Sequence, residues 1–128
     1  MTTSDNQWAG CRVLLVEDDY LIAKAMGTEF GALGAEVIGP AGSVESALEL
    51  IATHELDAAV LDINLYEVMS YPVAEALLAR GVPFVFATGY DKAALPERYA
   101  HVPHCEKPVE PYQLAQALFA RLSPDVLT

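Results

Sequence analysis

Val13-Leu14-Leu15-Val16 is an apolar run that ends in three consecutive carboxylates, Glu17-Asp18-Asp19, and a helical pattern begins directly after them. An apolar run of this kind is typical of a buried parallel strand, and ligands collect at the carboxyl ends of such strands in open α/β sheets. Adjacent like charges repel one another unless a cation lies among them. The stretch therefore predicts a cation site after the first strand, although an Asp here is also a common helix cap.

Length and composition predict one globular domain. The chain has 128 residues, of which 53% are hydrophobic and 20% are charged, and this is enough to bury a core. Eighteen acidic against seven basic residues give a net charge of −11. This charge argues against nucleic acid or an anionic membrane as a partner and is compatible with a cation site.

The sequence has no features of a membrane or secreted protein. No apolar run approaches the ~20 residues of a membrane span, and the first ten residues lack the pattern of a signal peptide. We therefore expect a cytoplasmic protein. Cys11 and Cys105 match no paired metal-ligand spacing, and we expect both to be free thiols.

Strand and helix patterns alternate along the chain. Ile22, Met26, Phe30 and Leu33 recur on one helical face. Further strands are expected at residues 36–39, 57–62, 83–87 and 104–106, with helices between them and a last helix opening at Pro111. This alternation predicts an α/β fold: a doubly wound, five-stranded parallel sheet in the flavodoxin-like order 2-1-3-4-5, with helices on both faces.

The domain is expected to cover residues 11–123, with an N-terminal tail at 1–10 and a C-terminal tail at 124–128. The fourth helix is expected to be weak, because Pro96 interrupts the segment between Tyr90 and Pro103. Residues 63–71 are expected to form a loop.

Reactive side chains follow four of the five expected strands. Glu17 and Asp18 follow the first, Asp62 the third, Thr88 the fourth and Lys107 the fifth. A strand-terminal Asp is often only a cap and a lone Lys is usually solvated, but these strand ends meet at one edge of a parallel sheet. Their convergence there predicts a functional site.

The residue types at this edge suit phosphoryl transfer. Carboxylates bind Mg²⁺, and an Asp can act as a nucleophile that becomes an aspartyl phosphate. The ammonium of Lys107 and the hydroxyl of Thr88 can contact the transferred phosphoryl oxygens. The sequence therefore predicts a Mg²⁺-dependent phosphoryl site centred on Asp62.

With these residues the chain resembles a response regulator receiver domain of bacterial two-component signalling over about residues 11–122. The resemblance implies that Asp62 is the phosphoacceptor and that Mg²⁺ is the cofactor. It also implies that the partners are a histidine kinase or histidine phosphotransfer protein and a downstream protein. For the metal, the resemblance implies an acidic pair at Glu17 and Asp18, with Asp18 as the direct ligand, and a backbone carbonyl ligand at Asn64. For the phosphoryl group, it implies a switch hydroxyl at Thr88 and a phosphate-binding lysine at Lys107. Asp19 matches no ligand role and is expected to cap the next helix.

A narrower resemblance comes from Pro83-Phe84-Val85-Phe86-Ala87-Thr88-Gly89-Tyr90. It fits the Pro-Phe-x-Phe-Ala-Thr-Gly-Tyr pattern of stand-alone receivers associated with HWE-type histidine kinases. His104 replaces the aromatic switch residue that is usual in receivers, so His104 and Tyr90 are switch candidates. Tyr90 equally suits simple packing over a loop, and the same two interpretations apply to Tyr66 and Met69 as candidate kinase contacts.

The function that follows is a single-domain phosphorylation switch that signals through protein–protein contacts. Such a protein catalyses its own phosphorylation and dephosphorylation and is not a turnover enzyme. One alternative is a phosphate-independent binding module on the same scaffold. Another is a phosphatase resembling the haloacid dehalogenases, but that class carries an acid two residues after its nucleophile, where this chain has Asn64.

Overall fold

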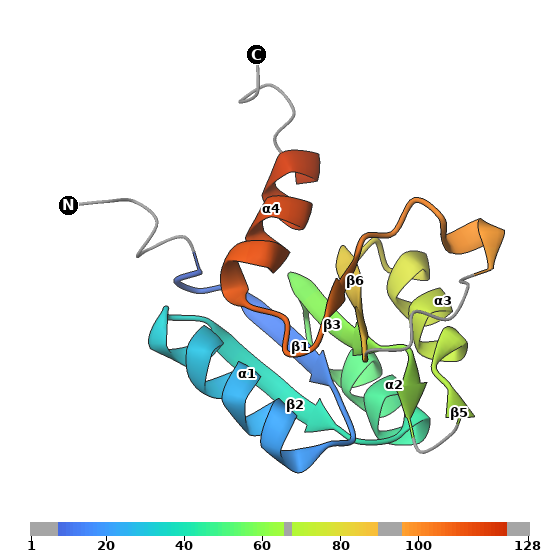
Figure 1. Cartoon of the computed structure of the whole chain (residues 1–128), viewed down its shortest axis with the longest axis horizontal. Helices are drawn as coiled ribbons and strands as arrows, with labels where there is room; N and C mark the ends of the chain where they lie inside the picture. Colours follow the sequence, from blue (N-terminus) through green and yellow to red (C-terminus); the bar gives the residue numbers. More distant parts are fainter. Residues whose placement is uncertain (1–7, 66–67, 90–95, 123–128) are drawn as a thin grey trace.

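The computed structural model describes residues 8–65, 68–89 and 96–122 (Figure 1). The strands of the main sheet are β1 (Arg12–Val16), β2 (Glu36–Ala41), β3 (Ala58–Asp62), β6 (Phe84–Thr88) and β7 (His104–Glu106). A small ribbon consists of β4 (Asn64–Leu65) and β5 (Val68–Met69). The helices are α1 (Tyr20–Ala32), α2 (Val44–Thr53), α3 (Tyr71–Ala79), the 3₁₀ turn η2 (Glu97–Tyr99) and α4 (Pro111–Leu122).

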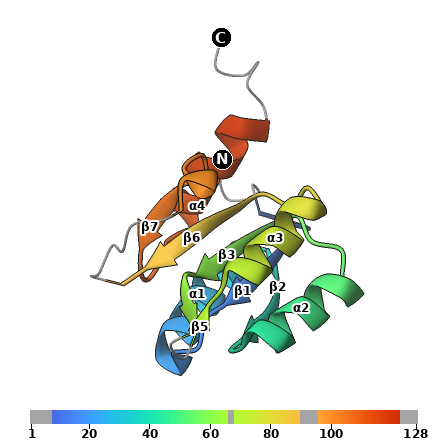
Figure 2. The same ribbon diagram turned by 90° about the vertical axis from the view of Figure 1, so that its right-hand side faces the viewer.

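The main sheet is parallel throughout, and its strands lie in the order β2-β1-β3-β6-β7. Counted along the chain, these are strands 2-1-3-4-5, so the predicted order is confirmed. Helices α1 and α4 contact each other, as do α2 and α3, and the two pairs lie on opposite faces of the sheet (Figures 1 and 2).

The three central strands are apolar because helices cover both of their faces. Every residue of β3 and β6 is buried. Successive side chains of β1 alternate between two cores: Leu14 and Val16 pack with residues of α2 and α3, whereas Val13 and Leu15 pack with residues of α1 and α4. The sheet is thus held rigidly between two apolar layers, which fixes where its strands end.

Side chains cap the starts of α1 and α2. Asp19 Oδ1 accepts hydrogen bonds from the backbone N–H groups of Leu21 at 3.0 Å and Ile22 at 3.1 Å. Ser43 forms a reciprocal capping box with Ser46 at the start of α2. Asp19 therefore serves as the N-cap of α1, as predicted.

Strand β2 runs two residues further than the expected 36–39. Gly39 has a φ of +101°, the pairing register shifts between Leu14 and Val16, and Ala41 pairs with Val16 after this irregularity. A β-bulge lets a strand continue past a local break in its ladder. The strand was expected to end at Gly39, but pairing resumes at Ala41.

The N-terminal segment contains a core residue. Trp8 lies within residues 1–10, the expected tail, but its side chain is 1% exposed and its ring meets that of Phe30 edge-on, with centroids 5.2 Å apart. An aromatic contact of this kind adds to the hydrophobic gain of burial. The packed part of the chain therefore includes Trp8.

Two other segments differ from simple loops. The segment 63–71 was expected to be a loop, but it contains the antiparallel β4–β5 ribbon and the first residue of α3. Between β6 and β7, the described residues form only the short η2 turn, in agreement with the predicted weakness of the fourth helix. No helix within the described ranges is both long and apolar enough to cross a membrane.

Candidate phosphoryl and metal site

The site lies at the carboxyl edge of the main sheet. Asp62 and Thr88 are the last residues of β3 and β6, and Glu17 and Lys107 come directly after β1 and β7. The parallel order of these strands brings the four residues to one edge, as the sequence predicts.

Lys107 joins the two buried acids of the site. Its Nζ atom donates to Asp62 Oδ2 at 3.0 Å and to Glu17 Oε2 at 3.2 Å. Asp62 is 3% exposed and Glu17 is 2% exposed, so both ion pairs are largely shielded from water. Ion pairs that are shielded in this way hold their side chains in fixed positions when their geometry is good.

Glu17, Asp18 and Asp62 form a group suited to a divalent cation. Each offers one carboxylate oxygen, and these oxygens lie within 4.8 Å of one another. Glu17 Oε1 is buried and has no hydrogen-bond partner among the described residues. Hard oxygen donors are the ligands that Mg²⁺ prefers. The donor set and the unsatisfied oxygen therefore fit a Mg²⁺ ion.

Burial and neighbouring charges shift the pKa values of Glu17 and Lys107. The pKa of Glu17 is raised to about 7, because burial, together with the charge of Asp62, outweighs the lowering effects of the backbone hydrogen bond from Asp19 and of the charge and hydrogen bond of Lys107. For Lys107, burial alone lowers the pKa, but the hydrogen bond and charge of Asp62 and the charge of Glu17 outweigh it, so its pKa is raised. Lys107 is thus a permanent cation among the carboxylates at neutral pH.

Thr88 and Asn64 lie at the border of this cluster. Thr88 is 3% exposed, and its Oγ1 donates to the carbonyl of Cys105 on β7 at 3.4 Å. The backbone N–H of Asn64 donates to Asp62 Oδ1 at 3.1 Å, while the Asn64 side chain is exposed. The structure therefore links Asn64 to Asp62 through the main chain and directs the Thr88 hydroxyl toward β7.

The remaining candidates are not part of the cluster. His104 is exposed on β7, where it pairs in register with Phe86. Met69 is 37% exposed on β5. Tyr90 and Tyr66 lie outside the described residues.

One site residue was missed by the sequence analysis. Ser70 is fully buried, and its Oγ donates to the backbone carbonyl of Asp62 at 2.5 Å. A serine before Tyr71-Pro72 is typical of a helix cap. The sequence therefore gives no indication that its hydroxyl contacts Asp62. Only the path of the β4–β5 ribbon brings the two residues together.

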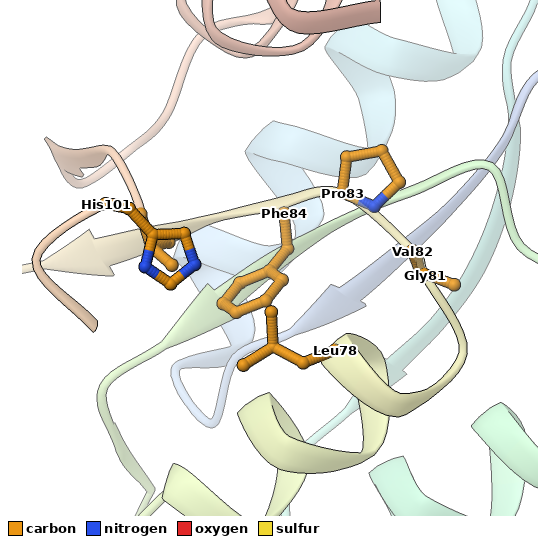
Figure 3. A pocket seen from close by; sticks show the side chains of 7 residues that line it. Leu78, Gly81, Val82, Pro83, Phe84 and His101 are labelled. Carbon is orange, nitrogen blue, oxygen red and sulfur yellow. The ribbon is translucent and has the colours of Figure 1, made fainter. Parts of the chain in front are cut away.

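A pocket of about 300 Å³ lies elsewhere, beside the amino end of β6. Figure 3 shows Phe84, Leu78 and His101 around it. None of its lining residues is acidic, and β6 separates it from the carboxyl edge where Asp62 lies. The pocket is therefore distinct from the acidic cluster.

The fold and the site define a class of protein: a doubly wound domain with an acidic cluster and a lysine at the sheet edge. The model of the response regulator receiver domain family matches residues 13–119. The chain belongs to this family, which serves two-component signalling and does not consist of conventional turnover enzymes.

Solved relatives agree with this assignment. The solution structure of SdrG from Sphingomonas melonis Fr1 is 39% identical to this chain, covers 88% of it and 96% of SdrG, and has a TM-score of 0.76. The BeF3-activated conformation of SdrG, from Pseudomonas melonis Fr1, is 38% identical and covers 89% of this chain and 98% of that one, with a TM-score of 0.70. PhyR from Brucella abortus has a TM-score of 0.74 at 23% identity, covering 97% of this chain and 54% of PhyR, and so shares the fold.

A curated relative is the transcriptional regulatory protein PdtaR of Mycobacterium tuberculosis. It is 25% identical over 108 residues, which are 84% of this chain and 53% of PdtaR. The chain thus spans about half the length of the curated relatives it matches.

Proposed function

We propose that the chain is a signalling phosphoacceptor whose Asp62 takes a phosphoryl group from the phosphohistidine of a partner protein. One carboxylate oxygen of Asp62 attacks phosphorus, a new P–O bond forms and the P–N bond breaks, and its electron pair stays on the departing imidazole. The product is an aspartyl phosphate, which water later hydrolyses.

The observation that carries this proposal is the ion pair between Lys107 Nζ and Asp62 Oδ2 in a buried acidic cluster. An ammonium at 3.0 Å from the nucleophile lies where negative charge spreads over the phosphoryl oxygens during transfer. Glu17 supports this role of Lys107, because Glu17 Oε2 accepts a hydrogen bond from the same ammonium and so holds Lys107 beside Asp62.

Asp18, Asp62 and the backbone carbonyl of Asn64 would hold Mg²⁺, with Glu17 nearby. When bound, the ion neutralises charge on the transferred group. Thr88 is the residue we assign to the phosphoryl oxygens. Its hydroxyl now donates across a long 3.4 Å bond to Cys105, so the side chain can change partner at little cost.

The donor in this proposal is a histidine kinase or a histidine phosphotransfer protein in the cytoplasm, and the receiver of the signal is a downstream protein. Receiver domains as a family interact with kinases and downstream proteins. A solved conformation of SdrG is described as BeF3-activated, and BeF3 is a chemical mimic of a phosphoryl group. Because phosphorylation adds charge to the site, it can shift the balance between two arrangements of the loops around it.

Intact mass after incubation with phosphoramidate, with and without Mg²⁺, tests the proposal. The native protein should gain one phosphoryl group only with Mg²⁺, and Asp62→Asn should gain none. Asp57→Asn is the matched control, since Asp57 is exposed and bonds to the backbone N–H of Arg12. No gain in the folded native protein would favour the phosphate-independent binding module.

A further inference from the structure

Ser70 connects the start of α3 to the phosphoacceptor. It is fully buried and bonds to two successive carbonyls: its Oγ donates to Asp62 at 2.5 Å and its backbone N–H donates to Ile63 at 2.8 Å. The β4–β5 ribbon leaves and returns between these residues. Ser70 thus closes the base of the ribbon at the backbone of the residue that carries the reactive carboxylate.

The Ser70 hydroxyl can make this contact because it does not cap α3. Ser70 stands at the N-cap position of α3, but its side chain makes no capping bond. Pro72 has no N–H group, and the N–H of Val73 bonds instead to the backbone carbonyl of Ser70 at 2.9 Å. By contrast, the hydroxyl of Ser43 does cap its own helix.

We propose that Ser70 is a positioning residue for phosphoryl transfer to Asp62, an inference that rests on the proposed function. The hydroxyl holds the carbonyl of Asp62, which is attached to the same Cα atom as the reactive side chain. That side chain must meet Lys107 Nζ and the Asn64 N–H at once, and each contact allows only a few tenths of an ångström. Without the Ser70 bond, the peptide group that contains this carbonyl keeps the hydrogen bond from the Ile63 N–H to the Ala87 carbonyl at 3.2 Å but loses the anchor on its own carbonyl, which loosens the carboxylate.

The test measures the rate of phosphorylation by phosphoramidate at saturating Mg²⁺. Ser70→Ala should lower this rate roughly tenfold, because small misplacements of reacting groups are costly. Ser70→Thr keeps the hydroxyl and should recover most of the rate. Ser46→Ala is the matched control: Ser46 is a part-buried serine whose hydroxyl bonds to Ser43 within the α2 cap, and its loss should leave the rate unchanged.

A second measurement does not depend on phosphorylation. In the metal-free protein, the amide resonance of Asn64 reports its hydrogen bond to Asp62 Oδ1, and Ser70→Ala should move it while Ser46→Ala should not. A native rate in Ser70→Ala, or an unmoved Asn64 resonance, would overturn the inference. If the native protein takes no phosphoryl group, the proposed function fails, and the Asn64 resonance alone then decides the role of Ser70.

Discussion

Lys107 Nζ lies 3.0 Å from Asp62 Oδ2, although 45 residues separate the two in the sequence. The contact depends on parallel pairing of β6 with both β3 and β7, which brings the ends of β3 and β7 to the same edge. An ammonium in this position holds together a group of acids that would otherwise repel one another. The same pair thus contributes to stability and to the proposed chemistry.

Replacement of Lys107 should destabilise the metal-free protein. Lys107→Met leaves the buried carboxylates of Glu17 and Asp62 without their cation. We expect the free energy of unfolding at pH 8 in EDTA to fall by about 1–2 kcal/mol, since solvent partly screens the ammonium. Urea unfolding measures this, with the exposed Lys24→Met of α1 as control. A Lys107→Met protein as stable as the native one would contradict the account.

Glu17 should make the stability of the metal-free protein depend on pH. Its pKa is about 7 in the folded state against an ordinary value of 4.5, so between these values the folded state binds more protons than the unfolded state. The free energy of unfolding should therefore fall as pH rises from about 4.5 to about 7.

Glu17→Gln should lose this part of the pH dependence and become more stable than the native protein near pH 8. Thermal unfolding in EDTA at several pH values checks it, with the exposed Glu29→Gln as control. Parallel pH curves for the native protein and Glu17→Gln would show that the carboxyl group is not perturbed.

Much of this site could be anticipated from strand ends alone. The apolar runs before Glu17, Asp62 and Thr88 predict buried parallel strands, and parallel strands deliver their ends to one edge. Ser70 could not be anticipated, because its partner is a backbone carbonyl and its sequence context is that of a helix cap. The position of Ser70 follows from the β4–β5 ribbon, whose two-residue strands are too short to show a sequence period.

Other differences have similar causes. Trp8 is an isolated aromatic residue in a polar segment, and its burial depends on tertiary contacts such as the edge-on contact with the ring of Phe30. The direction of the Thr88 hydroxyl toward Cys105 depends on the register of β6 and β7. Strand register and side-chain direction depend on tertiary contacts, so a local sequence pattern does not predict them.

Tyr99 should be the main anchor of the segment between β6 and β7. Its ring is fully buried, stacks on Tyr71 at 5.3 Å and meets Phe86 edge-on at 5.7 Å. Tyr99→Ala should lower the free energy of unfolding by about 3–5 kcal/mol through loss of this packing. Tyr112→Ala is the control, because Tyr112 is 61% exposed. Equal effects of the two substitutions in urea unfolding would show that Tyr99 is not packed as described.

A side chain at Gly39 should destabilise the protein. A Cβ atom there would lie 2.9 Å from both Ala41 N and Leu15 O, and its φ is +101°. We expect Gly39→Ala to destabilise the protein by about 1–3 kcal/mol. Gly31→Ala on α1 meets nothing within 4 Å and should stabilise the protein by about 0.5 kcal/mol. Thermal unfolding of both variants checks the opposite signs, and a neutral Gly39→Ala would rule out the bulge geometry at β2.

The central claim is that Asp62 carries the phosphoryl group. Borohydride reduction of the protein after phosphoramidate treatment converts an aspartyl phosphate to homoserine, which tandem mass spectrometry of peptides locates by residue. We expect homoserine at residue 62, only in the presence of Mg²⁺ and of the donor. Homoserine at another acid, such as Asp18, or at none in a folded and Mg²⁺-loaded protein would contradict it.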